Sequence, residues 1–236
     1  MRLLVRALPN VIVIALIVSF GAINLVVYSG LVEGEDAVDV RAQAGATSRD
    51  EALERARMAE QDDSAGLPGR FVASQGIQHI QAGQRVEFCP PGLVTQTCYA
   101  SNPPTSGLHL PVQRDIELPD GHRVNIPPDP GNYDFPIPRE AIPHIQEHAG
   151  VYVGFNCAST ACEDAVDEVE RLVGQALEEG QRVVMSPDPD LDADTIALAS
   201  WTRVDSFPAS DYEQTRVGRF IEAHSCRFDP ERFCGS

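Results

Sequence analysis

The sequence predicts an α+β protein: a single extracytoplasmic domain with a mixed sheet, preceded by one transmembrane helix. The chain of 236 residues opens with a long apolar run. Its C-terminal part instead alternates short apolar runs, typical of buried strands, with segments whose apolar residues recur at helical spacing. All six cysteines lie beyond the first apolar run, as expected for a domain exported to an oxidising compartment.

The first apolar run extends from Ala7 to Gly30. This is long enough for a helix to cross a bilayer, which takes about 20 residues. Arg2 and Arg6 precede the run, and no basic residue follows until Arg41. The asymmetry predicts a cytoplasmic tail at 1–6, an anchor at 7–30 and a periplasmic or extracellular remainder. A cleaved signal peptide is the alternative, but its apolar core is only about 7–15 residues long and ends in small residues.

The negative net charge restricts the classes of molecule that the protein is expected to bind. The formal net charge is −17, and every basic residue is an arginine. Contacts with nucleic-acid phosphates need clustered basic groups, so nucleic acid is not expected as a partner. The absence of lysine excludes Schiff-base chemistry and a lysine nucleophile. The expected associations are the membrane, through the N-terminal helix, and protein partners in the cell envelope.

The cysteines form three close pairs along the chain: Cys89 with Cys98, Cys157 with Cys162, and Cys226 with Cys234. An even number of cysteines in an exported chain predicts disulfides. Of the 15 pairings that six cysteines allow, the local one is the simplest. The second pair follows a predicted strand and opens a predicted helix, where a thiolate is favoured. A thiol-disulfide redox protein is therefore an alternative function, although the four-residue spacer is longer than usual.

The chain after the anchor divides into an acidic stalk at 31–74, with one short helix, and a disulfide-braced domain at 75–236. In the second half of this domain the sequence predicts a helix at 143–149, a strand at 151–156 and a helix at 163–177. Strands at 182–186 and 196–204 and a helix at 211–224 follow. This order resembles the second half of a thioredoxin-like arrangement, which by itself does not determine function.

Two histidines share a short predicted helix, with Pro143 in its first turn and Gly150 after its end. His144 and His148 are four residues apart and therefore lie on one helical face. This spacing is a common way to hold a transition metal. Glu147 completes a His-x-x-Glu-His motif, in which it would act as the general base of an inverted zinc protease. The predicted helix is short for such an enzyme.

Two further histidines occupy rigid local settings. His109 ends a proline- and glycine-rich loop, and His79 lies at the start of a predicted strand. We therefore predict a metal site formed by His79, His109, His144 and His148. Imidazole ligands suit zinc or copper. The alternative is a non-enzymatic partner-binding module whose histidines only pack, while His122 is expected in a solvated turn and His224 in a structural role.

Several segments resemble one family, and the most specific is the block Pro103-Pro104-Thr105-Ser106-Gly107-Leu108-His109. The others are Gly76–His79, Gly131–Tyr133, His144–Gly150, Ala197–Trp201 and Pro230-Glu231. Together they are similar to the bacterial domain-of-unknown-function family numbered 3105, over about residues 75–232. The resemblance implies an exported or single-pass protein whose family histidines are His79, His109, His144 and His148. It implies no reaction.

Overall fold

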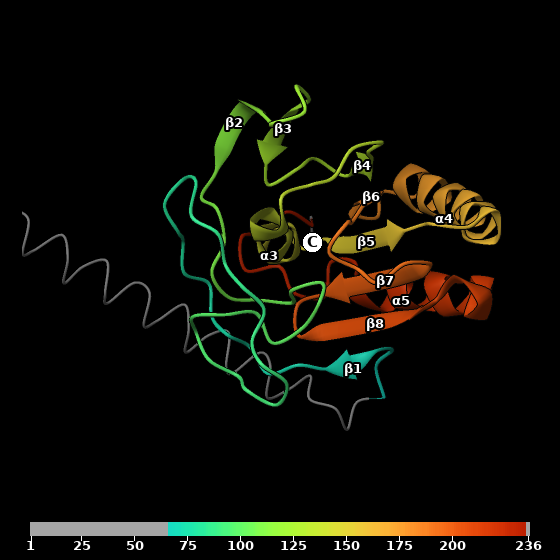
Figure 1. Ribbon diagram of the computed structural model, residues 1–236, viewed down its shortest axis with the longest axis horizontal. Coiled ribbons are helices and arrows are strands. Elements are labelled where there is room, and N and C mark those ends of the chain that lie inside the picture. The colour runs from blue at the N-terminus through green and yellow to red at the C-terminus, as the bar shows by residue number, and fades with distance from the viewer. Residues whose placement is uncertain (1–65, 235–236) are drawn as a thin grey trace, which may run out of the picture. The chain divides into compact units, whose positions relative to one another are not determined.

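The computed structural model describes residues 66–234 (Figure 1). The predicted tail, the anchor at 7–30 and most of the predicted stalk lie outside these residues. Within the described part of the chain, no helix combines the length and the apolar character needed to cross a membrane.

A mixed six-stranded sheet forms the centre of the domain, in the order β1-β8-β7-β5-β6-β4. Strand β5 (Val151–Asn156) pairs in parallel with β6 (Val183–Pro187) and antiparallel with β7 (Thr195–Ser200). Strand β8 (Arg203–Pro208) follows β7 in a hairpin, and Figure 1 shows these central strands side by side. The short strands β1 (Arg70–Phe71) and β4 (Gly131–Asn132) form the two edges. The α+β class with a mixed sheet is therefore confirmed.

The hairpin corrects one sequence prediction. The segment 196–204 was expected to be one strand, but the chain reverses at Trp201 and Thr202, so β7 and β8 are separate antiparallel strands. Thr202 takes up a left-handed conformation with φ of +61°, which a β-branched residue rarely adopts. Because the turn contains no glycine, asparagine or proline, the sequence carries no signal of it. Trp201 is completely buried and stacks on Phe228 with ring centroids 4.4 Å apart.

Two helices cover one face of the sheet. Helix α4 (Thr160–Glu178) begins after Ser159, whose hydroxyl accepts a hydrogen bond from the Cys162 amide, a standard N-terminal cap. Helix α5 (Gln214–His224) follows a 3-10 turn, η3 (Ala209–Asp211). The apolar stripes of both helices pack on the side chains that β5, β6 and β7 present to this face.

The opposite face carries the irregular half of the domain. There α3 (Ile142–Glu147) and the hairpin of β2 (Gln113–Glu117) and β3 (Arg123–Ile126) pack against the sheet with the preceding loops. Tyr152, Val184 and Ala199 are the sheet residues in this second core. Alternate residues of one strand thus serve two cores, which explains why β5 is apolar along its length.

The beginning of the described chain is held to the sheet. Arg70 and Phe71 were assigned to the end of the stalk, yet as strand β1 they pair with β8. The Nε2–H of His224 donates to the Pro68 carbonyl across 2.9 Å. His224 is 1% exposed, so this histidine fastens the incoming chain to α5.

Three disulfides brace the domain: Cys89–Cys98, Cys157–Cys162 and Cys226–Cys234. Each joins neighbours along the chain, the simplest of the pairings considered from sequence. No free cysteine remains, because these bonds use all six. Such a set indicates an oxidising compartment.

Candidate metal centre

Helix α3 carries two of the candidate ligands and is buried along its whole length. It follows the 3-10 turn η2 (Arg139–Ala141) and has Pro143 in its first turn, where a proline costs no hydrogen bond. Its end is tight, because the Gly150 amide donates back to the Ile145 carbonyl across 2.9 Å. A Cβ on Gly150 would lie 2.7 Å from that carbonyl oxygen, so only glycine fits. The histidine helix predicted at 143–149 therefore ends earlier, at Glu147.

Two loops bring in the other histidines, and backbone bonds join them. His79 and His109 form a parallel β-bridge, in which the Ile80 amide donates to the His109 carbonyl and the His109 amide donates to the Gln78 carbonyl. Gly107, two residues before His109, has φ of +104°, a conformation that glycine adopts without strain. This pairing aligns two segments that lie far apart in the sequence.

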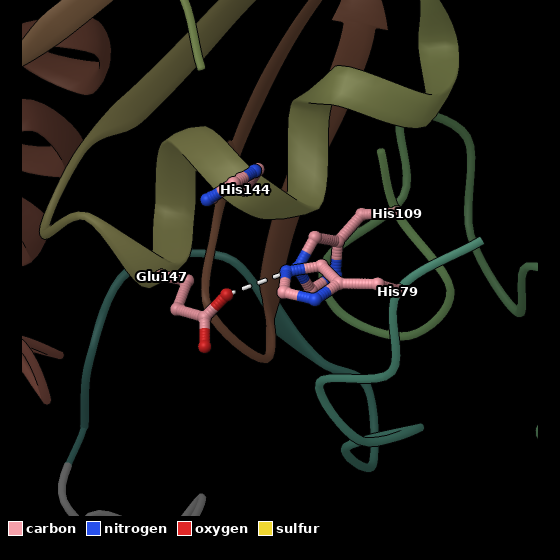
Figure 2. A group of neighbouring side chains, drawn as sticks. All are labelled: His79, His109, His144 and Glu147. Carbon is pink, nitrogen blue, oxygen red and sulfur yellow. Dashed lines mark ion pairs between the residues drawn. The ribbon is translucent and has the colours of Figure 1, made fainter. Parts of the chain in front are cut away.

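Four side chains converge between these loops and the helix (Figure 2). They are His79, His109, His144 and Glu147, and one ligand atom of each lies within 4.8 Å of all the others. His109 and His144 are almost completely buried, Glu147 is buried, and His79 is exposed. Figure 2 shows Glu147 reaching from α3 towards the two loop histidines. The cluster is thus fixed on its inner side and accessible at His79.

Two backbone carbonyls determine which ring nitrogens of His109 and His144 are available to bind a metal. The Nδ1–H of His109 donates to the Gly107 carbonyl across 2.8 Å, and that of His144 donates to the Leu110 carbonyl across 2.7 Å. A carbonyl only accepts, so both Nδ1 atoms carry the proton. In the neutral rings the lone pair then lies on Nε2. Metal-binding histidines are typically oriented in this way by an outer carbonyl or carboxylate.

The electrostatics favour neutral imidazoles at His79 and His144 beside an ionised carboxylate at Glu147. Burial, together with the charges of His109 and His148, lowers the pKa of His144 to about 4. Burial and His109 also lower the pKa of His79. Burial raises the pKa of Glu147, but the close contact with His109 and the charges of His109, His144 and His79 outweigh it and hold this pKa below its usual value. At neutral pH His79 and His144 therefore offer lone pairs, and Glu147 offers a negative charge.

The contact between the His109 imidazole and the Glu147 carboxylate is not satisfied by a hydrogen bond. The Nε2 of His109 and the Oε2 of Glu147 are 3.0 Å apart, yet this buried Nε2 makes no hydrogen bond of acceptable geometry. When the His109 ring is neutral, its proton lies on Nδ1, and the lone pair on Nε2 faces the carboxylate. A buried arrangement of this kind needs a proton or a metal ion between the two atoms.

A comparison with protein families identifies the family of this chain. Residues 93–234, more than half of the chain, match the family described as protein of unknown function DUF3105. The chain belongs to this family. No curated protein and no solved structure matches it. The DUF3105 match contains His109, His144 and Glu147, whereas His79 precedes it.

His148, a ligand predicted from the sequence, is not among the four clustered side chains. The His148 ring contacts that of His144, with centroids 4.6 Å apart, but its Nε2 lies 3.2 Å from a carboxylate oxygen of Glu231. Glu147, three residues after His144, takes the fourth position in the cluster. The same helical-face argument that selected His148 also applies to a spacing of three, so the sequence did contain this signal.

The remaining histidines of this family member have other surroundings. His122 is exposed in its turn, its Nδ1 lies 3.2 Å from an Asp120 carboxylate oxygen, and its ring stacks on Phe135. His224 lies on α5 and bonds to Pro68. Neither belongs to the cluster of potential metal ligands found among residues 66–234.

Proposed function

We propose that this chain is a membrane-anchored protein whose extracytoplasmic domain binds one transition-metal ion through His79, His109, His144 and Glu147. The observation that carries the proposal is the buried Nε2 of His109, which faces the Glu147 carboxylate at 3.0 Å without a hydrogen bond. A metal ion supplies the missing positive charge and accepts both lone pairs.

The four groups have nearly the spacing of a coordination sphere. Ligands bound at about 2.0–2.2 Å around a tetrahedral ion stand roughly 3.3–3.5 Å apart. The four candidate atoms lie within 4.8 Å of one another, so the widest pair would have to close by about 1.5 Å at most.

A proton is the competing explanation for the short contact. A proton between His109 and Glu147 satisfies only those two groups. It gives no reason for a carbonyl to direct the Nε2 of His144 as well, nor for three imidazole rings to lie with centroids 4.7–5.7 Å apart. A metal ion uses one lone pair from each of them.

The ligand set restricts the metal. It offers nitrogen and oxygen atoms, while all cysteines are held in disulfides and provide no thiolate. Cu(I) prefers soft sulfur ligands, whereas imidazole and carboxylate suit Zn²⁺ and Cu²⁺. We therefore expect Zn²⁺ or Cu²⁺. A bound ion of this kind would act as a Lewis acid or be carried as cargo, and exposure at His79 is compatible with both.

The test uses the full chain, purified in mild detergent without chelators. We expect elemental analysis to find about one metal ion per chain. The variants His109→Ala, His144→Ala and Glu147→Gln should each weaken binding by more than the roughly 10–100-fold that loss of an outer partner costs. The matched control is His122→Ala. A wild-type protein that stays metal-free when supplied with Zn²⁺ and Cu²⁺ would end the proposal.

One observation favours a second function, thiol-disulfide exchange. The Cys157–Cys162 disulfide follows β5 and opens α4, and the strand order β8-β7-β5-β6 is compatible with the thioredoxin-like arrangement expected from sequence. However, the Asp194 carboxylate accepts bonds from the Ala158 and Ser159 amides and from the Ser159 hydroxyl. A carboxylate in this turn opposes a thiolate. A reduction potential below about −300 mV would identify a structural bond and dismiss this function.

A further inference from the structure

The last described residues form a small loop against the end of α3. The Cys226–Cys234 disulfide closes this loop, which we call the C-terminal clasp (residues 226–234). The Asp229 carboxylate accepts hydrogen bonds from the Phe233 and Cys234 amides across 2.8 and 2.9 Å. The Cys226 amide donates to the Ala149 carbonyl across 2.9 Å. The clasp is thus internally braced and attached immediately after the residues that carry the metal centre.

The clasp holds His148 from two sides. The Phe233 ring stacks on the imidazole with centroids 4.1 Å apart and an angle of 26° between the planes. The Glu231 carboxylate lies 3.2 Å from the imidazole Nε2, a close contact without the geometry of a hydrogen bond. Because His148 directly follows Glu147, these contacts also fix the end of the helix that presents the Glu147 carboxylate.

Arg182 joins the clasp to the sheet side of the domain. Its guanidinium lies 4.9 Å from the centroid of the Phe233 ring, and its Nε–H donates to the His148 carbonyl across 2.7 Å. Phe233 is therefore held between an imidazole and a guanidinium, although it is 43% exposed. Because this ring is partly exposed, it stabilises the clasp more by orienting its neighbours than by burying apolar surface.

The clasp also adds negative charge beside the metal centre. Burial raises the pKa of Glu231, and the nearby carboxylates of Glu147 and Asp229 raise it further. Two glutamates thus lie close enough to feel each other's charge.

We propose that the C-terminal clasp is a redox-sensitive lock on the metal centre: the Cys226–Cys234 disulfide holds Glu231 and Phe233 against His148, and its reduction loosens Glu147 and weakens metal binding. This inference rests on the proposed function. In the reduction, a dithiol gives two electrons and two protons to the disulfide. The S–S bond breaks, Cys226 and Cys234 become thiols, and the dithiol becomes a disulfide.

The position of this disulfide supports such a role. Cys226 is exposed, whereas Cys162 in the α4 disulfide is 1% exposed. A dithiol reagent needs access to a sulfur atom. Without the disulfide, the loop remains attached by the backbone bond from Cys226 to Ala149 and by the side-chain contacts of Glu231 and Phe233.

The experiment compares two pairs of substitutions in the full chain. Cys226→Ser with Cys234→Ser opens the clasp, and Cys157→Ser with Cys162→Ser opens the remote disulfide as a matched control. Competition with a chromogenic chelator measures Zn²⁺ affinity. We expect the clasp variant to bind Zn²⁺ at least about tenfold more weakly, as for loss of an outer support, and the control to bind like the wild type. Equal affinities of the clasp variant and the wild type would refute the lock.

A second variant separates loosening from misfolding. Glu231→Gln with Phe233→Leu keeps the disulfide, and the apo protein should unfold near the wild-type temperature while its Zn²⁺ affinity falls several-fold. Its Co²⁺ absorption spectrum should differ from that of the wild type, since Glu147 is less well oriented. An unchanged spectrum and affinity would count against the lock. Failure of wild-type protein to bind Zn²⁺ or Co²⁺ would instead defeat the proposed function itself.

Discussion

Metal-linked stability gives the most direct check on the centre, and His144→Ala is the perturbation that best separates its parts. A ligand that binds only the folded state stabilises it by about 2.7 kcal/mol at a free concentration of 100 times Kd. For a domain of about 150–250 residues, 1 kcal/mol corresponds to roughly 2–4 °C in Tm. Saturating Zn²⁺ should therefore raise the Tm of the wild type by about 5–11 °C.

His144→Ala should also lower the stability of the metal-free protein, for a reason that the structure defines. His144 is 1% exposed, and its Nδ1–H donates to the Leu110 carbonyl. Alanine leaves that carbonyl without this donor, which costs about 1–3 kcal/mol. In metal-free buffer, the Tm of the variant should thus fall by roughly 2–12 °C.

Thermal unfolding with and without Zn²⁺ distinguishes the two effects. The variant should start lower in the apo state and lose the Zn²⁺-induced rise, while His122→Ala retains both the apo Tm and the rise. A His144→Ala protein that is destabilised but still gains the full wild-type increment would refute a ligand role for His144. It would instead support a histidine that only packs.

Three further predictions concern the scaffold. Gly150→Ala places a Cβ 2.7 Å from the Ile145 carbonyl oxygen, so urea unfolding should show a loss of about 1–3 kcal/mol and weaker Zn²⁺ binding. Burial raises the pKa of Asp188 from 3.8 to about 6. Because the folded state therefore binds the proton more tightly than the unfolded state, the free energy of unfolding falls as pH rises from about 4 to 6. Asp188→Asn should remove that loss, so its stability relative to the wild type grows by about 2 kcal/mol between pH 4 and pH 7, and a constant difference across this range would contradict the assignment. Ser159→Ala removes the α4 cap and should cost about 1 kcal/mol in the same unfolding assay, with Zn²⁺ affinity unchanged.

Local patterns in the sequence account for much of the regular half of the fold. The apolar runs of β5 and β6 and the apolar stripes of α4 and α5 are strong periodic signals. The main error, one strand in place of β7 and β8, occurred where Thr202 makes a turn without turn-forming residues. Local information was insufficient there because burial of Trp201 against Phe228 stabilises the reversal.

The sequence predicted most residues of the candidate site, but not the contacts that bring them together. The proline- and glycine-rich loop before His109 and the short helix of His144 are visible in the sequence. The backbone bridge between His79 and His109 is not, since it joins two irregular segments with no periodicity. Glu147 and His148 lie on adjacent positions of one short helix, and the contacts of Glu231 and Phe233 with His148 are non-local, so sequence alone could not decide between them.

The unequal burial of the four groups bears on what a bound metal would do. His109, His144 and Glu147 are fixed by carbonyls, by α3 and by the core, whereas His79 is exposed. A closed structural site usually surrounds its ion with four fixed ligands, whereas catalytic sites retain an open position. With three rigid groups and one accessible imidazole, a bound ion would be reached from solvent without opening either core. This geometry favours exchange of the metal or of a bound water over a purely structural ion, and His79→Ala should therefore speed Zn²⁺ release to a chelator more than it alters the apo Tm.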